Sequence, residues 1–185
     1  MPAYPITLHH LLVSPKHRYF GRPAAEAGID PDDERDEIVA QAGLGVAGDR
    51  YFGVAAHFTA QITFVAIETF REVAAALGTG EQSPLLMRRN VVVEGMPVMQ
   101  LIGLDFAIEC AGERVEFAGG RHCAPCRWMD AMLGDGAQQL LRGRGGLRAQ
   151  IVAGGRLHRG AALLHCDLRP DQFDPAGAMR YPRLP

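Results

Sequence analysis

The stretch GGRHCAPCRWMD, residues 119–130, places Cys123 and Cys126 three positions apart, with a histidine before them and an arginine after them. Two thiols at this spacing can act as a redox dithiol, as half of a zinc site, or as one reactive thiolate beside a second cysteine. A dithiol of the thioredoxin type needs the motif at the start of a helix within a βαβ unit. CRWMDAML could form that helix, but short strands precede the motif.

A zinc site needs more ligands than this motif offers, and the other two cysteines stand alone. Cys110 and Cys166 lie in apolar, strand-like surroundings, where we expect buried thiols that pack as small hydrophobic groups. The remaining interpretation makes Cys126 a thiolate, because the amide end of a short helix and the adjacent Arg127 both lower the pKa of a thiol. A thiolate is a nucleophile or a soft metal ligand. Two half-buried thiols in a turn, without chemical function, remain an alternative.

The glycine-rich stretch GLGVAGDRYFG, residues 43–53, is a second candidate. Its glycines let the backbone approach another group closely, and Asp49 with Arg50 supplies an ion-pairing couple. Neither a Walker spacing nor a dinucleotide-binding fingerprint is present, so the pattern indicates a phosphate loop only weakly. A plain turn between strands explains the same residues.

Arg88, Arg89 and Asn90 lie where a strand is expected to begin. Neighbouring side chains on a strand point to opposite faces, so both guanidiniums cannot face a dry core, and at least one must be exposed or paired. An arginine and an asparagine turned into a cavity would suit a phosphate or another oxyanion through forked hydrogen bonds. Arg121, just before the cysteines, is a further candidate for the same cavity.

The elements that must position these residues are mostly short strands. Alternating or continuous apolar runs predict strands over residues 6–14, 60–68 and 91–93, and two more on either side of Ala111 and Gly112. The last predicted element is a hairpin with a tight turn at residues 153–155 and a returning strand through residues 157–164. Residues 166–185 are rich in proline, and we expect irregular structure there.

Helices are fewer. Residues 68–78 place Phe70, Val73, Ala74 and Leu77 on one helical face, which is typical of core packing, and Gly78 ends the helix. Two short helices, separated near residues 134–136, follow the cysteines. Because no helix fits between most consecutive strands, a doubly wound α/β fold is disfavoured. We expect a single, mainly β domain over residues 1–185, a β-barrel with a few flanking short helices.

The amino-acid composition bears on which classes of binding partner the protein could have. With 48% hydrophobic and 22% charged residues and a formal net charge of −2, the chain gives no electrostatic case for binding nucleic acid or a membrane. It has no run of apolar residues long enough to span a bilayer and no signal-peptide pattern, so we expect a cytoplasmic protein with reduced thiols. Lys16 is the only lysine and lies in a loop-like stretch, so a Schiff-base cofactor would have to use that residue.

The order of these segments resembles the MOSC family, named for the C-terminal domain of molybdenum cofactor sulfurases. The resemblance runs from Gly43 to Leu164 and is carried by GDR, by RN before a valine strand, by LIG, by Pro-Cys and by the closing GLRAQIVAGGRLHRG. The family commonly ends its last segment in Gly-Asp, whereas here Gly160 is followed by Ala161.

The resemblance implies a β-barrel that binds the pyranopterin molybdenum cofactor or handles its sulfur. It places the family's cysteine at Cys126, as molybdenum ligand or as carrier of sulfane sulfur, and leaves Cys123 without a role. The positions matched to the cofactor cavity and the glycine-rich signature are Asp49, Arg50, Arg89 and Asn90, to which the residue chemistry adds Arg88 and Arg121 as candidate cofactor-binding residues.

Partners follow from the same resemblance. The pyridoxal phosphate domain of the full sulfurase has no counterpart in this sequence, so no pyridoxal phosphate is expected, and a separate sulfur donor or an electron-donor reductase is implied. As a molybdoenzyme, the protein would be an oxidoreductase that reduces N-hydroxylated small molecules. Two alternatives from other classes remain: a CxxC dithiol redox protein, and a noncatalytic β-barrel binding module.

Overall fold

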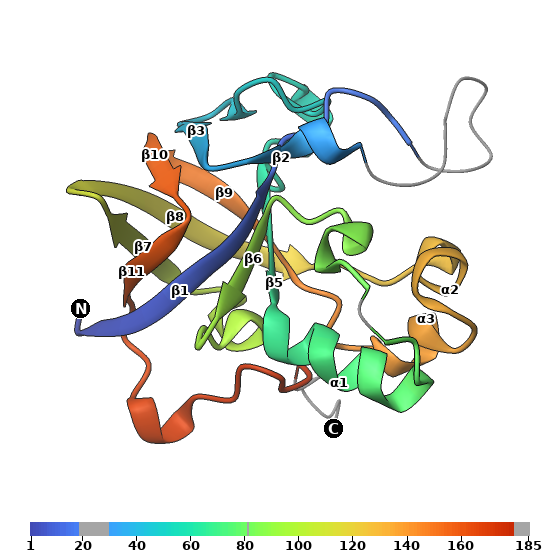
Figure 1. Ribbon diagram of the computed structural model, residues 1–185. Coiled ribbons are helices and arrows are strands. Elements are labelled where there is room, and N and C mark those ends of the chain that lie inside the picture. The colour runs from blue at the N-terminus through green and yellow to red at the C-terminus, as the bar shows by residue number, and fades with distance from the viewer. Residues whose placement is uncertain (19–29, 81, 180–185) are drawn as a thin grey trace, which may run out of the picture.

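The structure is a computed structural model that describes residues 1–18, 30–80 and 82–179 (Figure 1). Residues 180–185 of the predicted proline-rich tail lie outside these ranges. Seven strands close into a barrel in the order β11-β7-β8-β9-β5-β6-β1, because β11 pairs with β1 as well as with β7. The strands of the barrel are β1 (Ala3–Leu12), β5 (Ile62–Ala66), β6 (Val91–Glu94), β7 (Asp105–Cys110), β8 (Glu113–His122), β9 (Leu147–Ala153) and β11 (Gly160–His165).

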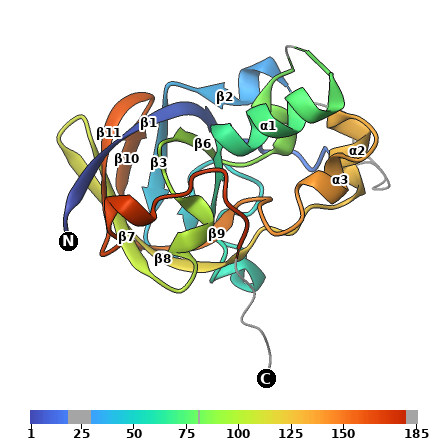
Figure 2. The same cartoon turned by 90° about the horizontal axis from the view of Figure 1, so that it is seen from below.

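Short elements complete the fold around the barrel. The strand β2 (Glu34–Arg35) pairs with β1, and β10 (Gly155–His158), β3 (Glu37–Gln41) and β4 (Gly45–Val46) form a separate three-stranded sheet. The helices α1 (Ile67–Leu77), α2 (Arg127–Leu133) and α3 (Ala137–Leu140) lie together on one side of the barrel in both views (Figure 1, Figure 2). The described part of the protein is therefore mainly β, as the sequence predicts, with three short flanking α-helices.

The strands β5 and β6 are buried on both faces, which explains their continuous apolar sequences. One face of each strand points into the barrel, where Phe64 packs edge-on against Phe106 and Phe117 at centroid distances of 5.7 and 5.2 Å. The other face, which carries Val65 and Val92, packs against the helices. The pair β5–β6 is the only parallel pair in the described sheets, and α1 is the crossover that a parallel pair requires.

The helix α1 buries Phe70 and Val73 against this outer face of the barrel. It ends at Gly78, which adopts the left-handed conformation with φ 64°. The helices α2 and α3 are separated by Gly134 and Gly136, as predicted. None of the described helices has the length and apolar character needed to span a membrane.

The predicted hairpin around residues 153–155 is wrong. β9 pairs with β8 and β5, β10 pairs with β3, and β11 pairs with β7 and β1. β8 runs along one edge of β9. The other edge contacts β5 at Leu147–Ala149 and, at Ile151, the Gln61 side chain and the backbone N–H of Gly43, while the returning chain pairs with β3. Gly154 is also absent from the residues with positive φ that a tight hairpin turn would need, and a Cβ there would lie 2.7 Å from Ala40 O. A glycine is needed at position 154 because the backbone there packs closely against β3.

Candidate functional site

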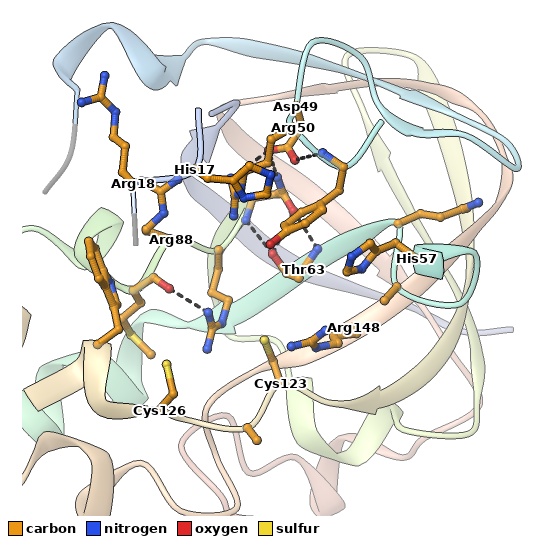
Figure 3. A pocket seen from close by; sticks show the side chains of 18 of the residues that line it. His17, Arg18, Asp49, Arg50, His57, Thr63, Arg88, Cys123, Cys126 and Arg148 are labelled. Carbon is orange, nitrogen blue, oxygen red and sulfur yellow. Dashed lines mark hydrogen bonds and ion pairs between the residues drawn. The ribbon is translucent and has the colours of Figure 1, made fainter. Parts of the chain in front are cut away.

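One cavity gathers most of the residues that the sequence singles out (Figure 3). It lies beside the first residues of β5, β6 and β9, just beyond the ends of β1 and β8, and encloses about 210 Å³. Of the seven predicted site residues, six line this cavity: Asp49, Arg50, Arg88, Arg89, Asn90 and Cys126. Segments far apart in the sequence thus converge at one end of the barrel.

The two cysteines occupy different places in this cavity. Cys123 follows β8 and is 3% exposed, and its backbone N–H donates to Gly146 O at 2.7 Å. Gly145 lies so close behind it that a Cβ there would stand 2.5 Å from Cys123 O. Cys126 is exposed and is the N-cap of α2, which puts its thiol at the rim (Figure 3). Both thiols are free, so the motif is asymmetric in burial.

The first turn of α2 is anchored by its aromatic residue. Trp128 is 2% exposed, and its indole N–H donates to Leu86 O at 2.7 Å. This bond joins α2 to the 3-10 helix Pro84–Met87 that precedes the arginine pair. The position of Cys126 relative to Arg88 is therefore fixed by a buried contact between the two segments.

The carboxylate of Asp49 accepts hydrogen bonds from several groups that surround the cavity. Its side chain is 6% exposed, and Oδ1 accepts a hydrogen bond from Tyr51 N at 3.0 Å. Oδ2 accepts from Ser14 N at 3.3 Å, Arg50 Nη1 at 3.4 Å and Asn90 Nδ2 at 3.3 Å. The chain itself thus uses the acceptor capacity of this carboxylate. Asp49 would support ligand binding by holding Arg50 in place, without touching the ligand.

Asn90 is likewise committed to the protein. Its Oδ1 accepts from Thr63 N at 3.0 Å and from Thr63 Oγ1 at 2.8 Å, and its Nδ2 donates to Leu12 O at 3.2 Å and to Asp49 at 3.3 Å. A primary amide offers two donors and two acceptor lone pairs, so its capacity is full. Asn90 joins β1, β5 and β6 at the cavity wall, and its predicted place beside a cofactor would be a positioning one.

The adjacent arginines face different partners. Arg88 adopts a left-handed backbone with φ 54°, and its Nη2 donates to Ser14 Oγ at 2.8 Å and to Lys16 O at 3.0 Å. Arg89 is 8% exposed, and it donates from Nε to Gly145 O at 2.9 Å and from Nη1 to Met87 O at 2.8 Å. Arg89 therefore ties the start of β6 to the glycine behind Cys123 and still has donors available.

The cavity is strongly cationic. The arginines that line it are Arg18, Arg50, Arg88, Arg89 and Arg148. Among the described residues that line it, Asp49 is the only acid. Burial, together with the charge of Arg50, lowers the pKa of Arg88 to about 10. A cluster of arginines in one cavity favours an anionic ligand, because the negative charge of the ligand would offset the repulsion among the guanidinium groups.

Arg121 does not line this cavity. It lies on β8, is exposed, and is the cross-strand partner of Arg148 on β9. Arg148 lines the cavity instead and supplies the guanidinium that the sequence assigned to Arg121. The sequence could not distinguish them, because it does not show that β9, and not the end of β8, carries the arginine that borders the cavity.

Further lining residues carry no local sequence signal. Gln61 is 7% exposed, and its Oε1 accepts from Ile151 N at 2.8 Å, while its Nε2 has no partner among the described residues. His57 stacks against Tyr51 at a centroid distance of 4.2 Å. Burial, followed by the charge of Arg148, lowers the pKa of His57 below its ordinary value, so the ring is neutral near pH 7.

The closed barrel defines the class of this protein: a mainly β fold, with a few short helices flanking the barrel in the part of the chain that the structure describes. Neither a protein-family model nor a curated protein sequence matches the chain. The evidence for the fold comes from solved structures.

The YuaD protein from Bacillus subtilis superposes with a TM-score of 0.70 at 18% identity, over 91% of this chain and 99% of that chain. YiiM from Escherichia coli superposes with a TM-score of 0.56 at 17% identity, over 91% of this chain and 71% of that chain. YiiM from Geobacillus stearothermophilus gives 0.56 at 11% identity, over 92% and 80%. Similarity at these identities shows the fold and assigns no activity.

Proposed function

We propose that this protein is a MOSC-family protein that binds the pyranopterin molybdenum cofactor in the cationic cavity, with Cys126 as the thiolate ligand of molybdenum. The observation that carries the proposal is the position of the Cys126 thiol on the rim of a cavity that five arginines line. Molybdenum favours a soft thiolate, and the phosphate of the cofactor favours arginine forks. Both donor types meet here.

The residues present fit this group. Among the described residues, no group of three or more His, Cys, Asp or Glu side chains could hold a metal ion. A metal in this cavity must therefore bring most of its own ligands, as a dithiolene cofactor does, and needs one sulfur from the chain. The unpartnered Nε2 of Gln61 offers a buried donor to an acceptor on the ligand.

Each part of the site would then have a distinct task. The cofactor, when bound, would supply electron and oxygen-atom transfer. Arg50, Arg88 and the remaining donors of Arg89 would bind its anionic groups, and Cys126 would hold the metal. Asp49 and Asn90 would keep these arginines and the adjoining strands in place.

The enzymatic version of this function is the reduction of an N-hydroxylated small molecule to the corresponding amine. That reaction consumes two electrons and two protons and releases one water molecule, with the N–O bond broken. The electrons would come from a separate electron-donor reductase, the partner that the family resemblance implies.

A second function uses the same residues. Cys126 is exposed, whereas Cys123 is buried, so a separate persulfide donor could reach the Cys126 thiol. Attack of the Cys126 thiolate on the outer sulfur of a donor persulfide forms a persulfide on Cys126 and releases the donor as a thiolate. This version makes the protein a sulfur carrier, and its signature is cyanide-labile sulfur without stoichiometric metal.

The test is metal and pterin analysis of protein produced in a host that makes the cofactor. We expect molybdenum and pterin in near-equal amounts in the wild type, and a much lower molybdenum content in Cys126→Ser, in which the retained metal lacks its protein sulfur ligand. Cys123→Ser is the matched control, because it alters the neighbouring thiol but leaves the rim thiol intact. Absence of both molybdenum and labile sulfur from the wild type would refute the proposal.

The same variants separate the alternatives from other classes. A dithiol redox protein would form a disulfide that either substitution abolishes, and both variants would lose activity equally. A noncatalytic binding module would bind its ligand unchanged in Cys126→Ser. Either result would overturn the role assigned to Cys126.

A further inference from the structure

Two donors on the cavity wall are left without partners by the chain itself. The Gln61 amide and the Arg148 guanidinium both line the cavity. Gln61 Nε2 is buried and has no hydrogen-bond partner, and within the described ranges no hydrogen bond or ion pair is found for the Arg148 guanidinium. Burial of an unsatisfied amide donor is energetically costly, so a folded protein that keeps one has a ligand or water to satisfy it.

The orientation of the Gln61 amide is fixed by the backbone. Its Oε1 accepts from Ile151 N at 2.8 Å, which continues the hydrogen-bond ladder beyond the start of β5. Exchanging the amide oxygen and nitrogen would place a donor against this N–H and lose the bond. The Nε2 group is therefore held away from the ladder as a preset donor.

The sheet brings Arg148 to the same wall. Thr63 on β5 is the cross-strand partner of Arg148 on β9, and Gln61 lies two positions before Thr63, so the three side chains share one face. Figure 3 shows Arg148 on the side of the cavity where His57, Thr63 and Cys123 lie, away from Arg18 and the rim thiol of Cys126. The charge of Arg148 also acts on His57. Burial is the largest cause that lowers the pKa of His57, and the charge of Arg148 is the second.

We propose that Gln61 and Arg148 form an oxyanion subsite that takes a phosphate or another tetrahedral oxyanion. Gln61 Nε2 supplies one neutral donor and the Arg148 guanidinium supplies a charged fork, the combination that suits tetrahedral oxygens. The inference rests on the proposed function in that both place a ligand in this cavity, but it requires no metal. The phosphate can belong to the cofactor or to a second, phosphorylated ligand.

The test titrates inorganic phosphate into the full-length protein, produced in a host that cannot make the cofactor, in chloride buffer by isothermal titration calorimetry. We expect Gln61→Glu to weaken phosphate binding at least about tenfold, because it keeps an oxygen for Ile151 N–H but replaces the donor with a carboxylate oxygen. Arg148→Gln should have a similar effect. Arg121→Gln is the matched control, since it removes the cross-strand neighbour that does not line the cavity, and it should bind within about twofold of wild type.

Each possible outcome either supports or overturns the proposed subsite. Failure of the wild type to bind phosphate at millimolar concentration, unchanged binding in Arg148→Gln, or an equal loss in Arg121→Gln would overturn the subsite. If Gln61→Glu does not fold, as judged by its thermal transition, the comparison of Arg148→Gln with Arg121→Gln still decides. Molybdenum and labile sulfur are measured separately on protein from a host that makes the cofactor. A protein that binds phosphate but holds neither refutes the proposed function and supports the subsite.

A second arm identifies the source of the phosphate. Protein loaded with cofactor is titrated in the same way. Loss of phosphate binding on loading indicates that the phosphate of the cofactor occupies Gln61 and Arg148. Retained binding indicates a phosphorylated second ligand. Both results require that the unloaded protein binds phosphate through these two residues.

Discussion

Replacing Asn90 with alanine tests whether this residue joins strands or binds a ligand. The sequence predicts a cofactor-binding role, whereas the structure gives its side chain four hydrogen bonds within the protein, to Thr63, Leu12 and Asp49. In Asn90→Ala these groups lose their partner at the point where β1, β5 and β6 meet. The two roles predict different results for stability.

The expected loss follows from the number of bonds. An internal hydrogen bond contributes about 0.5–1.5 kcal/mol net, so four partly buried bonds give a destabilisation of about 2–6 kcal/mol. In a domain of this size that corresponds to a decrease in Tm of about 4–24 °C. Thr63→Val removes one member of the cluster at similar volume and should cost about 1–2 kcal/mol.

Equilibrium urea unfolding is the assay. The chain has one tryptophan, and Trp128 is 2% exposed beside the cavity, so its fluorescence reports unfolding. A double-mutant cycle of Asn90→Ala with Thr63→Val should give a coupling energy of about 1 kcal/mol or more. If Asn90→Ala costs less than about 1 kcal/mol, shows no coupling and still abolishes ligand binding, then Asn90 contacts the ligand and the structural role is wrong.

Three further changes follow from local geometry. Gly145→Ala puts a Cβ 2.5 Å from Cys123 O, so we expect a loss of about 1–3 kcal/mol in urea unfolding, and a neutral substitution would contradict the close packing. Because its pKa lies below the ordinary 6.5, His57 resists protonation in the folded protein, so folding stability decreases as pH falls through that value. Arg148→Gln should raise the His57 pKa in an NMR titration, and an unchanged value would contradict their proximity. Ala111→Gly, at φ 50°, should raise stability by up to about 1 kcal/mol in thermal unfolding, and a decrease would show that this turn is not strained.

Local pattern was enough for most of the fold. An alternating, β-branched run predicted the strand that became β5, a continuous apolar run predicted β6, and the 3.6-residue stripe with a terminal Gly78 predicted α1. The hairpin at residues 153–155 was wrong because the sequence shows a possible turn but does not show that the chain after it pairs with β3 instead of β9. Strand pairing over long separations is not written in any short window.

The residues of the candidate site were likewise only partly predictable from the sequence. Cys126, the arginine pair and the glycine-rich stretch stood out because their residue types or spacing are unusual. Gln61 and Arg148 are single polar residues at the starts of strands, and only the pairing of β5 with β9 brings them together. Arg121 looked equivalent to Arg148 from the sequence, yet it lies outside the cavity. Asp49 and Asn90 were found, but their internal bonds become visible only in three dimensions.

The most direct test of the central claim is X-ray absorption at the molybdenum edge of the purified, cofactor-loaded protein. The number of sulfur neighbours of the metal is compared between the wild type and Cys126→Ser, with Cys123→Ser as control. The account predicts one sulfur neighbour fewer in Cys126→Ser and an unchanged number in Cys123→Ser. The same sulfur count in wild type and Cys126→Ser would contradict it.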